Sequence, residues 1–160
     1  MTMIERRERP WETSYNGFSW EQRCAVTPLQ NAALREGRLV RPTICTICLD
    51  GRSERPQARD YRFLHLEDYC RPLEVYGCCK RCHASLHARF RDPERWQGLM
   101  ARHYREGEWF TMLSLDPCSQ WEPFDQTYPS GLPWSDYSKD KITDLFDAMV
   151  KPIEQGQNHR

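Results

Sequence analysis

Two pairs of closely spaced cysteines constrain this chain more than any other feature of its sequence. Cys45-Thr-Ile-Cys48 and Cys79-Lys-Arg-Cys82 are both C-x2-C knuckles, in which the two-residue gap lets the backbone turn tightly around one ion. Each knuckle can present two thiolates, so the two together complete a tetrahedral set. We therefore predict a structural zinc site formed by Cys45, Cys48, Cys79 and Cys82. The alternatives are a redox pair and unrelated buried thiols.

The other four of the eight cysteines have no partner at a metal-like spacing. Such residues are small buried side chains by default, and this is the expectation for Cys24, Cys70, Cys78 and Cys118. Cys78 lies directly before Cys79, so the spacing leaves open which of these two thiols is the zinc ligand.

Length and composition indicate a globular protein of ordinary size. The 160 residues are 39% hydrophobic and 29% charged, which fits one domain with extensions. The uncharged apolar runs are short, and no apolar stretch follows the charges near the start. We therefore expect no membrane span, no secretory signal and a cytoplasmic location. In that compartment, cysteines favour metal binding over disulfides.

The formal net charge of zero conceals an uneven distribution. Up to Arg105 there are 19 basic and 13 acidic residues, whereas the remainder has 4 basic and 10 acidic ones. The chain is thus a basic body with an acidic tail. Basic side chains are dense after the second knuckle and predict contacts with a phosphate backbone, although a solvated helix face would have the same pattern. The residues predicted to bind nucleic acid are Lys80, Arg81, Arg89, Arg91 and Arg95.

Capping signals and hydrophobic patterning predict several short elements. Thr27-Pro28 is typical of a helix start and Gly37 of a helix end, while Asp92-Pro93 begins another helix. Residues 59–66 alternate partly in the manner of a strand. The predicted helices span 28–36, the second knuckle to Phe90, and 93–105, and the predicted strands span 59–66 and 73–78.

The tail differs in kind from the body. Between Pro117 and Pro133 four prolines are interleaved with aromatic residues, which predicts an extended segment whose aromatic side chains pack on another surface. Apolar residues at helical spacing then predict an amphipathic helix over about 140–150.

Two stretches resemble a known family. ALREGRLVRPTICTIC is similar to the helix and first knuckle, and LHLEDYCRPLEVYGCCKRCHASLH to the HHEDY…PLEV…C-x2-C-H-x3-H core, of small zinc-knuckle proteins of bacteriophages within the HNH, or ββα-metal, endonucleases. The resemblance covers residues 29–90. It implies an α+β fold: a small zinc-stapled ββα-metal module over 27–105, an N-terminal extension over 1–26, and an acidic, aromatic C-terminal extension over 106–160.

The resemblance also implies a second metal site. His65 corresponds to the first histidine of the family's pair, and His83 and His87, four residues apart on one helix face, supply the other ligands. Such a site would hold a divalent cation (Mg, Mn, Ni or Zn) beside a scissile phosphate. The alternative is that the three histidines only satisfy hydrogen bonds or pack beside the knuckle.

The general base of the family is missing from its expected position. Its second histidine, which takes a proton from the attacking water, falls on Leu66, and leucine accepts no proton. Loss of a positioned base costs about 10²–10⁴ in rate. Shifting the register to make His65 the base would leave Leu64 as a ligand, so the site stays incomplete. Asp60, Asp68 and His103 are the substitute bases to consider.

Three functions follow as hypotheses. The first is a catalytically degenerate nuclease that binds duplex DNA or a host nucleic-acid-handling protein. The second is an active divalent-metal-dependent endonuclease or nickase with a replacement base. The third is a phage-encoded inhibitor of a host protein that acts through protein contact, because the acidic tail with its aromatic residues resembles an interaction surface.

Overall fold

The computed structural model describes residues 14–50 and 62–133, which form an α+β fold. The helices and strands follow in this order: α1 (Trp20–Arg35), β1 (Phe63–His65), β2 (Tyr76–Cys78), α2 (Lys80–Ala88), α3 (Pro93–His103), the 3-10 helices η1 (Trp109–Met112) and η2 (Pro117–Gln120), and α4 (Phe124–Thr127).

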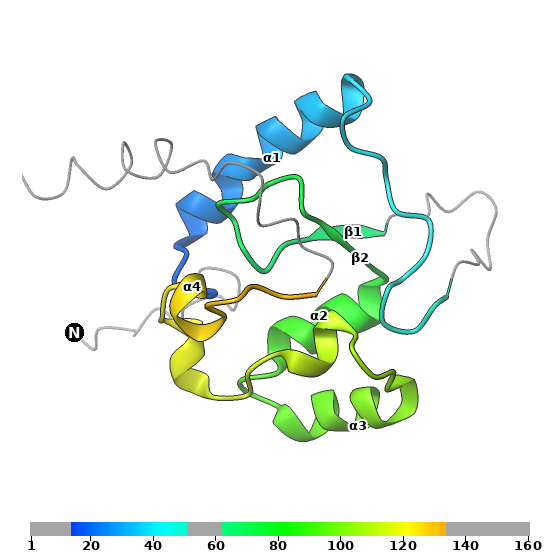
Figure 1. Cartoon of the computed structure of the whole chain (residues 1–160), viewed down its shortest axis with the longest axis vertical. Coiled ribbons are helices and arrows are strands. Elements are labelled where there is room, and N and C mark those ends of the chain that lie inside the picture. The colour runs from blue at the N-terminus through cyan, green and yellow to red at the C-terminus, as the bar shows by residue number, and fades with distance from the viewer. Residues whose placement is uncertain (1–13, 51–61, 134–160) are drawn as a thin grey trace, which may run out of the picture.

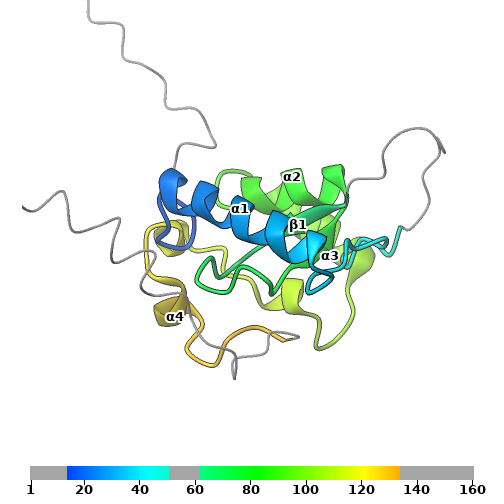
Figure 2. The same ribbon diagram turned by 90° about the horizontal axis from the view of Figure 1, so that it is seen from above.

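A two-stranded antiparallel hairpin lies between α1 and α2 (Figure 1), and α1 crosses over β1 when the molecule is seen from above (Figure 2). The register places Phe63 opposite Cys78 and His65 opposite Tyr76. Helix α2 begins two residues after β2 and packs on both β1 and α3. The short connection therefore brings the end of β1 beside the first turns of α2.

Helix α1 begins earlier than the sequence signals predict. Ser19 is its N-cap, and a capping box joins Ser19 and Gln22 through two reciprocal hydrogen bonds. Pro28 lies inside the helix, so the prediction that Thr27-Pro28 starts it is wrong. The capping box outweighs the proline because the side chains of Gln22 and Ser19 satisfy two backbone N–H donors at the true N-terminus of the helix.

The other predicted elements of the body are confirmed, with different bounds. The two strands are only three residues long each, and residues 59–61 of the predicted first strand lie outside the described residues. Helix α2 ends at Ala88, and α3 begins at Pro93 with Asp92 as its N-cap, whose side chain accepts a hydrogen bond from the backbone N–H of Arg95.

Residues after Arg105 contribute much of the core. Trp109 and Phe110 are fully buried in η1, and Phe124 and Tyr128 are buried around α4. The stretch predicted to be extended therefore contains two short helices, η2 and α4, and two of its aromatic side chains pack inward. Trp121 differs, because it is largely exposed.

The N-terminal residues also join this core. Tyr15 and Phe18 are buried, and a tight turn between them contains Gly17 at φ +76°. The backbone N–H of Gly17 donates to the carbonyl of Gln120, and a Cβ at position 17 would lie 2.8 Å from the Glu122 carbonyl oxygen. The described parts of all three predicted segments therefore meet in one core, and the division into 1–26, 27–105 and 106–160 stays a prediction.

Two further expectations concern the ends of the chain and its environment. The predicted helix over 140–150 lies outside the described residues. Within 14–50 and 62–133, no helix is both long enough and apolar enough to cross a membrane.

Candidate metal sites and the cleft beside them

The first knuckle lies in the loop after α1 and docks on β2. The backbone N–H of Thr46 donates to the carbonyl of Gly77, and a Cβ at Gly77 would lie only 2.4 Å from the Cβ of Pro42. Only glycine permits this approach. On the other side, the Arg105 guanidinium donates to the carbonyls of Thr46 and Ile47. The knuckle is thus held between β2 and the end of α3.

The second knuckle lies at the start of α2, where Cys79 is the N-cap and Cys82 belongs to the first turn. Thiolates here face the positive end of the helix dipole, which stabilises their charge. Cys79 makes no side-chain capping hydrogen bond within the helix, so its sulfur remains available for a metal.

The two knuckles meet and form a cluster compatible with a structural zinc. The sulfur atoms of Cys45, Cys48, Cys79 and Cys82 all lie within 4.8 Å of one another, and the Cys48 and Cys79 sulfurs are 3.8 Å apart. Four sulfurs at ~2.3 Å from one tetrahedral ion would be about 3.8 Å apart. A hydrogen bond with the Cys82 thiol lowers the pKa of Cys45 to about 4, and the same pairing raises the pKa of Cys82.

The structure decides which of the adjacent cysteines faces the cluster. Cys79 belongs to it, whereas Cys78 is a fully buried residue of β2, and burial raises the pKa of its thiol. Cys78 is thus the buried residue that was expected, and Cys70 is half-buried. Cys24 and Cys118 are exposed, so the expectation of burial is wrong for both. Cys24 belongs to α1 and lines a cleft, and Cys118 belongs to η2; the spacing of the cysteines does not reveal their exposure.

The three predicted histidines also come together. His65 ends β1, and His83 and His87 follow one another by one turn on α2, so strand and helix present them to one point. Their ligand atoms lie within 4.8 Å of one another, and the Nε2 atoms of His83 and His87 are 3.1 Å apart. Two nitrogens at ~2.05 Å from one tetrahedral ion would be about 3.3 Å apart.

The chemistry of these donors fits a divalent cation. The Nδ1 atom of His65 is buried without a hydrogen-bond partner, which is costly unless another group binds it. Burial lowers the pKa of His83 to about 3 and lowers that of His87 as well, so both rings are neutral near pH 7 and keep a lone pair for a metal. The three-histidine group can therefore hold a second metal.

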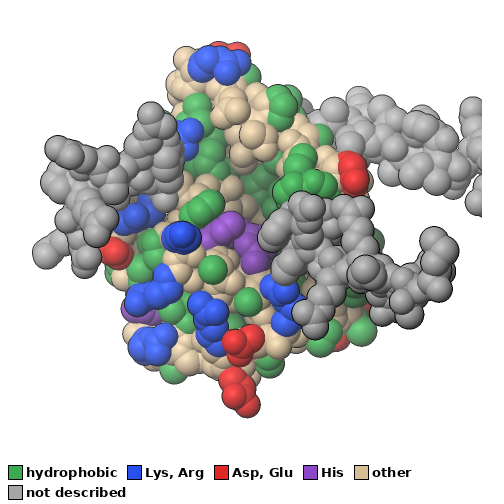
Figure 3. Space-filling model, turned by 180° about the vertical axis from the view of Figure 1, so that it is seen from behind, with side chains coloured by type: hydrophobic (Ala, Val, Ile, Leu, Met, Phe, Trp, Pro, Cys, Tyr) green, Lys and Arg blue, Asp and Glu red, His purple; other side chains and the backbone are tan. Residues whose placement is uncertain are grey.

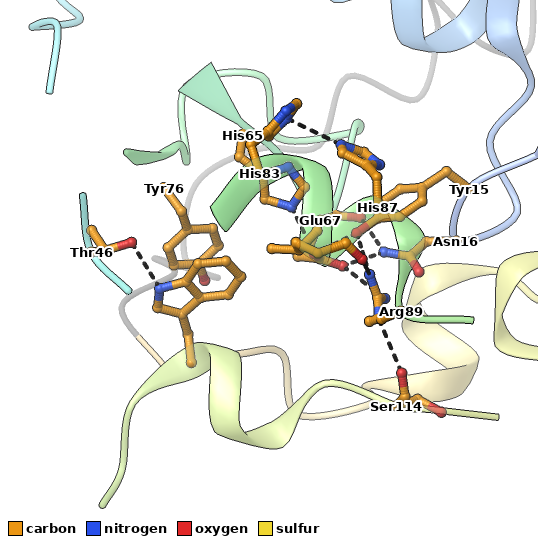
Figure 4. A network of polar contacts seen from close by, with 12 residues as sticks. Tyr15, Asn16, Thr46, His65, Glu67, Tyr76, His83, His87, Arg89 and Ser114 are labelled. Carbon is orange, nitrogen blue, oxygen red and sulfur yellow. Dashed lines mark hydrogen bonds and ion pairs between the residues drawn. The ribbon is translucent and has the colours of Figure 1, made fainter. Parts of the chain in front are cut away.

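A buried carboxylate that the sequence analysis did not single out supports His65. Glu67 is only 1% exposed, and its Oε1 atom lies 2.7 Å from His65 Nε2 (Figure 4). Tyr15 and Asn16 donate hydrogen bonds to the same carboxylate, and Arg89 forms an ion pair with it. Burial raises the pKa of Glu67, but the Arg89 charge and the hydrogen bonds outweigh it and lower the pKa to about 2. The residues next to Glu67 in the sequence, His-Leu-Glu-Asp, do not indicate that it contacts partners so far away along the chain.

A cleft of about 720 Å³ opens beside the histidines. Trp20, Phe63 and Tyr69 contribute aromatic side chains to its lining, while His83 and His87 lie at the same cleft. Among the described residues, the charged lining consists of Arg23 and Arg91, with no Asp or Glu. Figure 3 shows histidine side chains at the surface of this face with Lys and Arg side chains gathered around them. The cleft thus favours an anion.

Leu66, Asp68 and His103 do not line the cleft. Leu66 is 2% exposed within the core, and it does not line the cleft. Asp68 is buried, accepts a hydrogen bond from the backbone N–H of Cys70 and pairs with Arg71, and neither Asp68 nor His103 lines the cleft. Asp60 lies outside the described residues.

The predicted basic patch is only partly at the surface. Lys80, Arg81, Arg91 and Arg95 are exposed on α2, α3 and the turn between them. Arg89 is 0% exposed, and it donates hydrogen bonds to the Tyr15 hydroxyl and the Ser114 carbonyl. The prediction that Arg89 binds nucleic acid is therefore wrong, because its guanidinium neutralises Glu67 in the interior.

Comparisons with protein-family models, curated proteins and solved structures give no match for this chain. Fold and sites define a small α+β protein in which a four-cysteine cluster of the zinc type adjoins a three-histidine site and a cleft.

Proposed function

We propose that this protein is a catalytically degenerate member of the HNH, or ββα-metal, class that binds nucleic acid at a divalent-metal site and cleaves it poorly or not at all. One observation carries the proposal: three converging imidazoles adjoin a cleft whose charged lining residues, within the described part of the chain, are arginines. A metal and two guanidinium groups together suit a phosphodiester.

The order of elements supports the class. The hairpin of β1 and β2 carries the first histidine, and the following helix α2 carries the other two. The four-cysteine cluster joins α2 to the loop that follows α1. This is the arrangement that the sequence resemblance implies. His65, His83 and His87 would hold the ion, which when bound supplies charge stabilisation at a phosphate oxygen.

The surroundings of the site support binding over catalysis. A nuclease needs a group that accepts a proton from water near the phosphate. Leu66 is apolar and buried, and Glu67 is buried with its oxygens committed to Tyr15, Asn16 and His65. The arginines at the cleft can position a phosphate, and within residues 14–50 and 62–133 no carboxylate lines it.

Binding to duplex DNA should depend on salt and on Arg91. This exposed residue lines the cleft, so Arg91→Ala is expected to weaken binding and to reduce the slope of log affinity against log salt by about one. Arg35→Ala is the matched control, because Arg35 is exposed in the last turn of α1 and does not line the cleft. Fluorescence anisotropy with a labelled duplex measures both. Affinity that does not change between low and physiological salt would contradict the proposal.

The purified protein is expected to leave supercoiled plasmid intact with magnesium, manganese or nickel. The reason is that the described residues place no carboxylate and no general-base histidine at the expected position in the cleft, and a positioned base is worth about 10²–10⁴ in rate. Agarose electrophoresis provides the measurement, and Leu66→His is the companion variant. Nicking by the wild type that disappears in His87→Ala would reject the degenerate site. Nicking by Leu66→His alone would show that Leu66 is the disabling residue.

A further inference from the structure

The Glu67 carboxylate is the centre of a buried network that links distant parts of the chain. Its Oε1 atom is 2.6 Å from the Tyr15 hydroxyl and 2.7 Å from His65 Nε2, and its Oε2 atom is 2.6 Å from Asn16 Nδ2. The Arg89 guanidinium lies 3.6 Å from Oε2. Figure 4 shows these side chains beside His83 and His87.

The hydrogen bonds fix the direction in which each proton points. Arg89 donates to the Tyr15 oxygen at 2.6 Å, so the Tyr15 hydroxyl proton is free to be donated to Glu67. An ionised carboxylate only accepts hydrogen bonds. His65 Nε2 must therefore carry the proton of the His65–Glu67 contact, and in a neutral ring Nδ1 then keeps the lone pair. Nδ1 is also the atom that has no partner within the protein.

We propose that Glu67 is a positioning residue for the divalent-ion site: it holds His65 in the Nε2–H tautomer with Nδ1 facing the ion, and Tyr15 and Asn16 hold Glu67. The inference rests on the metal-binding part of the proposed function. Carboxylates that orient a ligating histidine typically contribute 10–100-fold to metal affinity.

This role makes the N-terminal segment part of the metal site. Tyr15 and Asn16 precede the residues that resemble the HNH family, and Tyr15 also contacts the His87 ring, with ring centroids 4.6 Å apart. Arg89 extends the network to the Ser114 carbonyl in the C-terminal part. Segments on both sides of the module therefore orient one histidine.

Cobalt titration of the zinc-loaded protein tests the proposal. With Co²⁺ as the probe, Glu67→Gln is expected to raise the dissociation constant 10–100-fold, because the neutral amide neither favours the Nε2–H tautomer nor attracts the cation. Glu74→Gln is the matched control, because Glu74 is a nearly buried carboxylate paired with Arg71 away from the histidines. Tyr15→Phe keeps the carboxylate and is expected to cause a smaller loss. Equal affinities for Glu67→Gln and Glu74→Gln would overturn the inference.

The tautomer of His65 provides a readout that a purely structural role would not require. Nitrogen-15 NMR of the zinc-loaded wild type, without cobalt, is expected to show His65 protonated at Nε2, and this measurement needs no variant to fold. A proton at Nδ1 would overturn the inference while leaving the proposed function intact. A wild type that does not bind Co²⁺ would instead reject the proposed function, and the positioning role with it.

Discussion

Loss of the four-cysteine metal site is expected to unfold the protein. The cluster joins the loop after α1 to the start of α2, and the sheet that the structure describes between them has two strands of three residues each. A hairpin of that size is not stable by itself. Structural zinc contributes about 10–16 kcal/mol in small zinc-dependent domains, whereas a whole domain is stable by only about 5–15 kcal/mol. The apo protein should therefore lose its tertiary structure.

Cys82→Ser removes one ligand and tests this prediction directly. Zinc content by mass spectrometry should fall, and the near-ultraviolet circular dichroism of buried Trp96 and Trp109 should collapse at ordinary temperatures. Cys24→Ser and Cys118→Ser are matched controls, since both thiols are exposed and outside the cluster. A Cys82→Ser protein that retains the wild-type thermal midpoint would show that the cysteines are only packed thiols.

Removal of one histidine ligand is expected to abolish the second metal site while the fold survives. His87→Ala deletes one of three converging nitrogens, so the affinity for Co²⁺ should fall by more than the 10–100-fold attributed to outer-shell groups. Because burial keeps the pKa values of His83 and His87 low, these two rings are neutral near pH 7 and would not have to release protons when a cation binds.

Calorimetric titration of zinc-loaded protein with Co²⁺ measures the change. His103→Ala is the control, because His103 ends α3 and does not belong to the histidine group. The four-cysteine zinc should remain in both variants. Undiminished Co²⁺ affinity in His87→Ala would mean that the histidines only pack against one another, as the alternative interpretation holds.

The sequence predicted α2 and α3 well because their signals are local. Asp92-Pro93 caps α3, and the knuckle leads into α2 as expected. Helix α1 was predicted eight residues too short at its start, because Pro28 resembles a first helical residue more than it resembles an interior one. The Ser19 and Gln22 capping box was present in the sequence and is the signal that could have corrected it.

Charge and proline content did not predict which residues after Arg105 contribute to the core. Trp109 and Phe110 are fully buried, and the ring centroids of His65 and Trp109 are 5.9 Å apart. Deletion of residues 106–160 would therefore remove side chains of the core. A truncation after residue 133 is the appropriate way to test whether the remaining tail affects DNA binding.

The sequence by itself predicted the two groups of donor residues that the structure brings together. A two-residue gap between cysteines and a four-residue gap between helical histidines fix the positions of donors within one turn, so local geometry suffices to predict them. Only the tertiary structure decided that Cys79 faces the cluster, that Arg89 is buried and that Glu67 contacts His65. These outcomes depend on contacts between residues as far apart as Tyr15 and Arg89, which are 74 positions apart. Such contacts form only because the assembled core brings these distant segments together and excludes water from them.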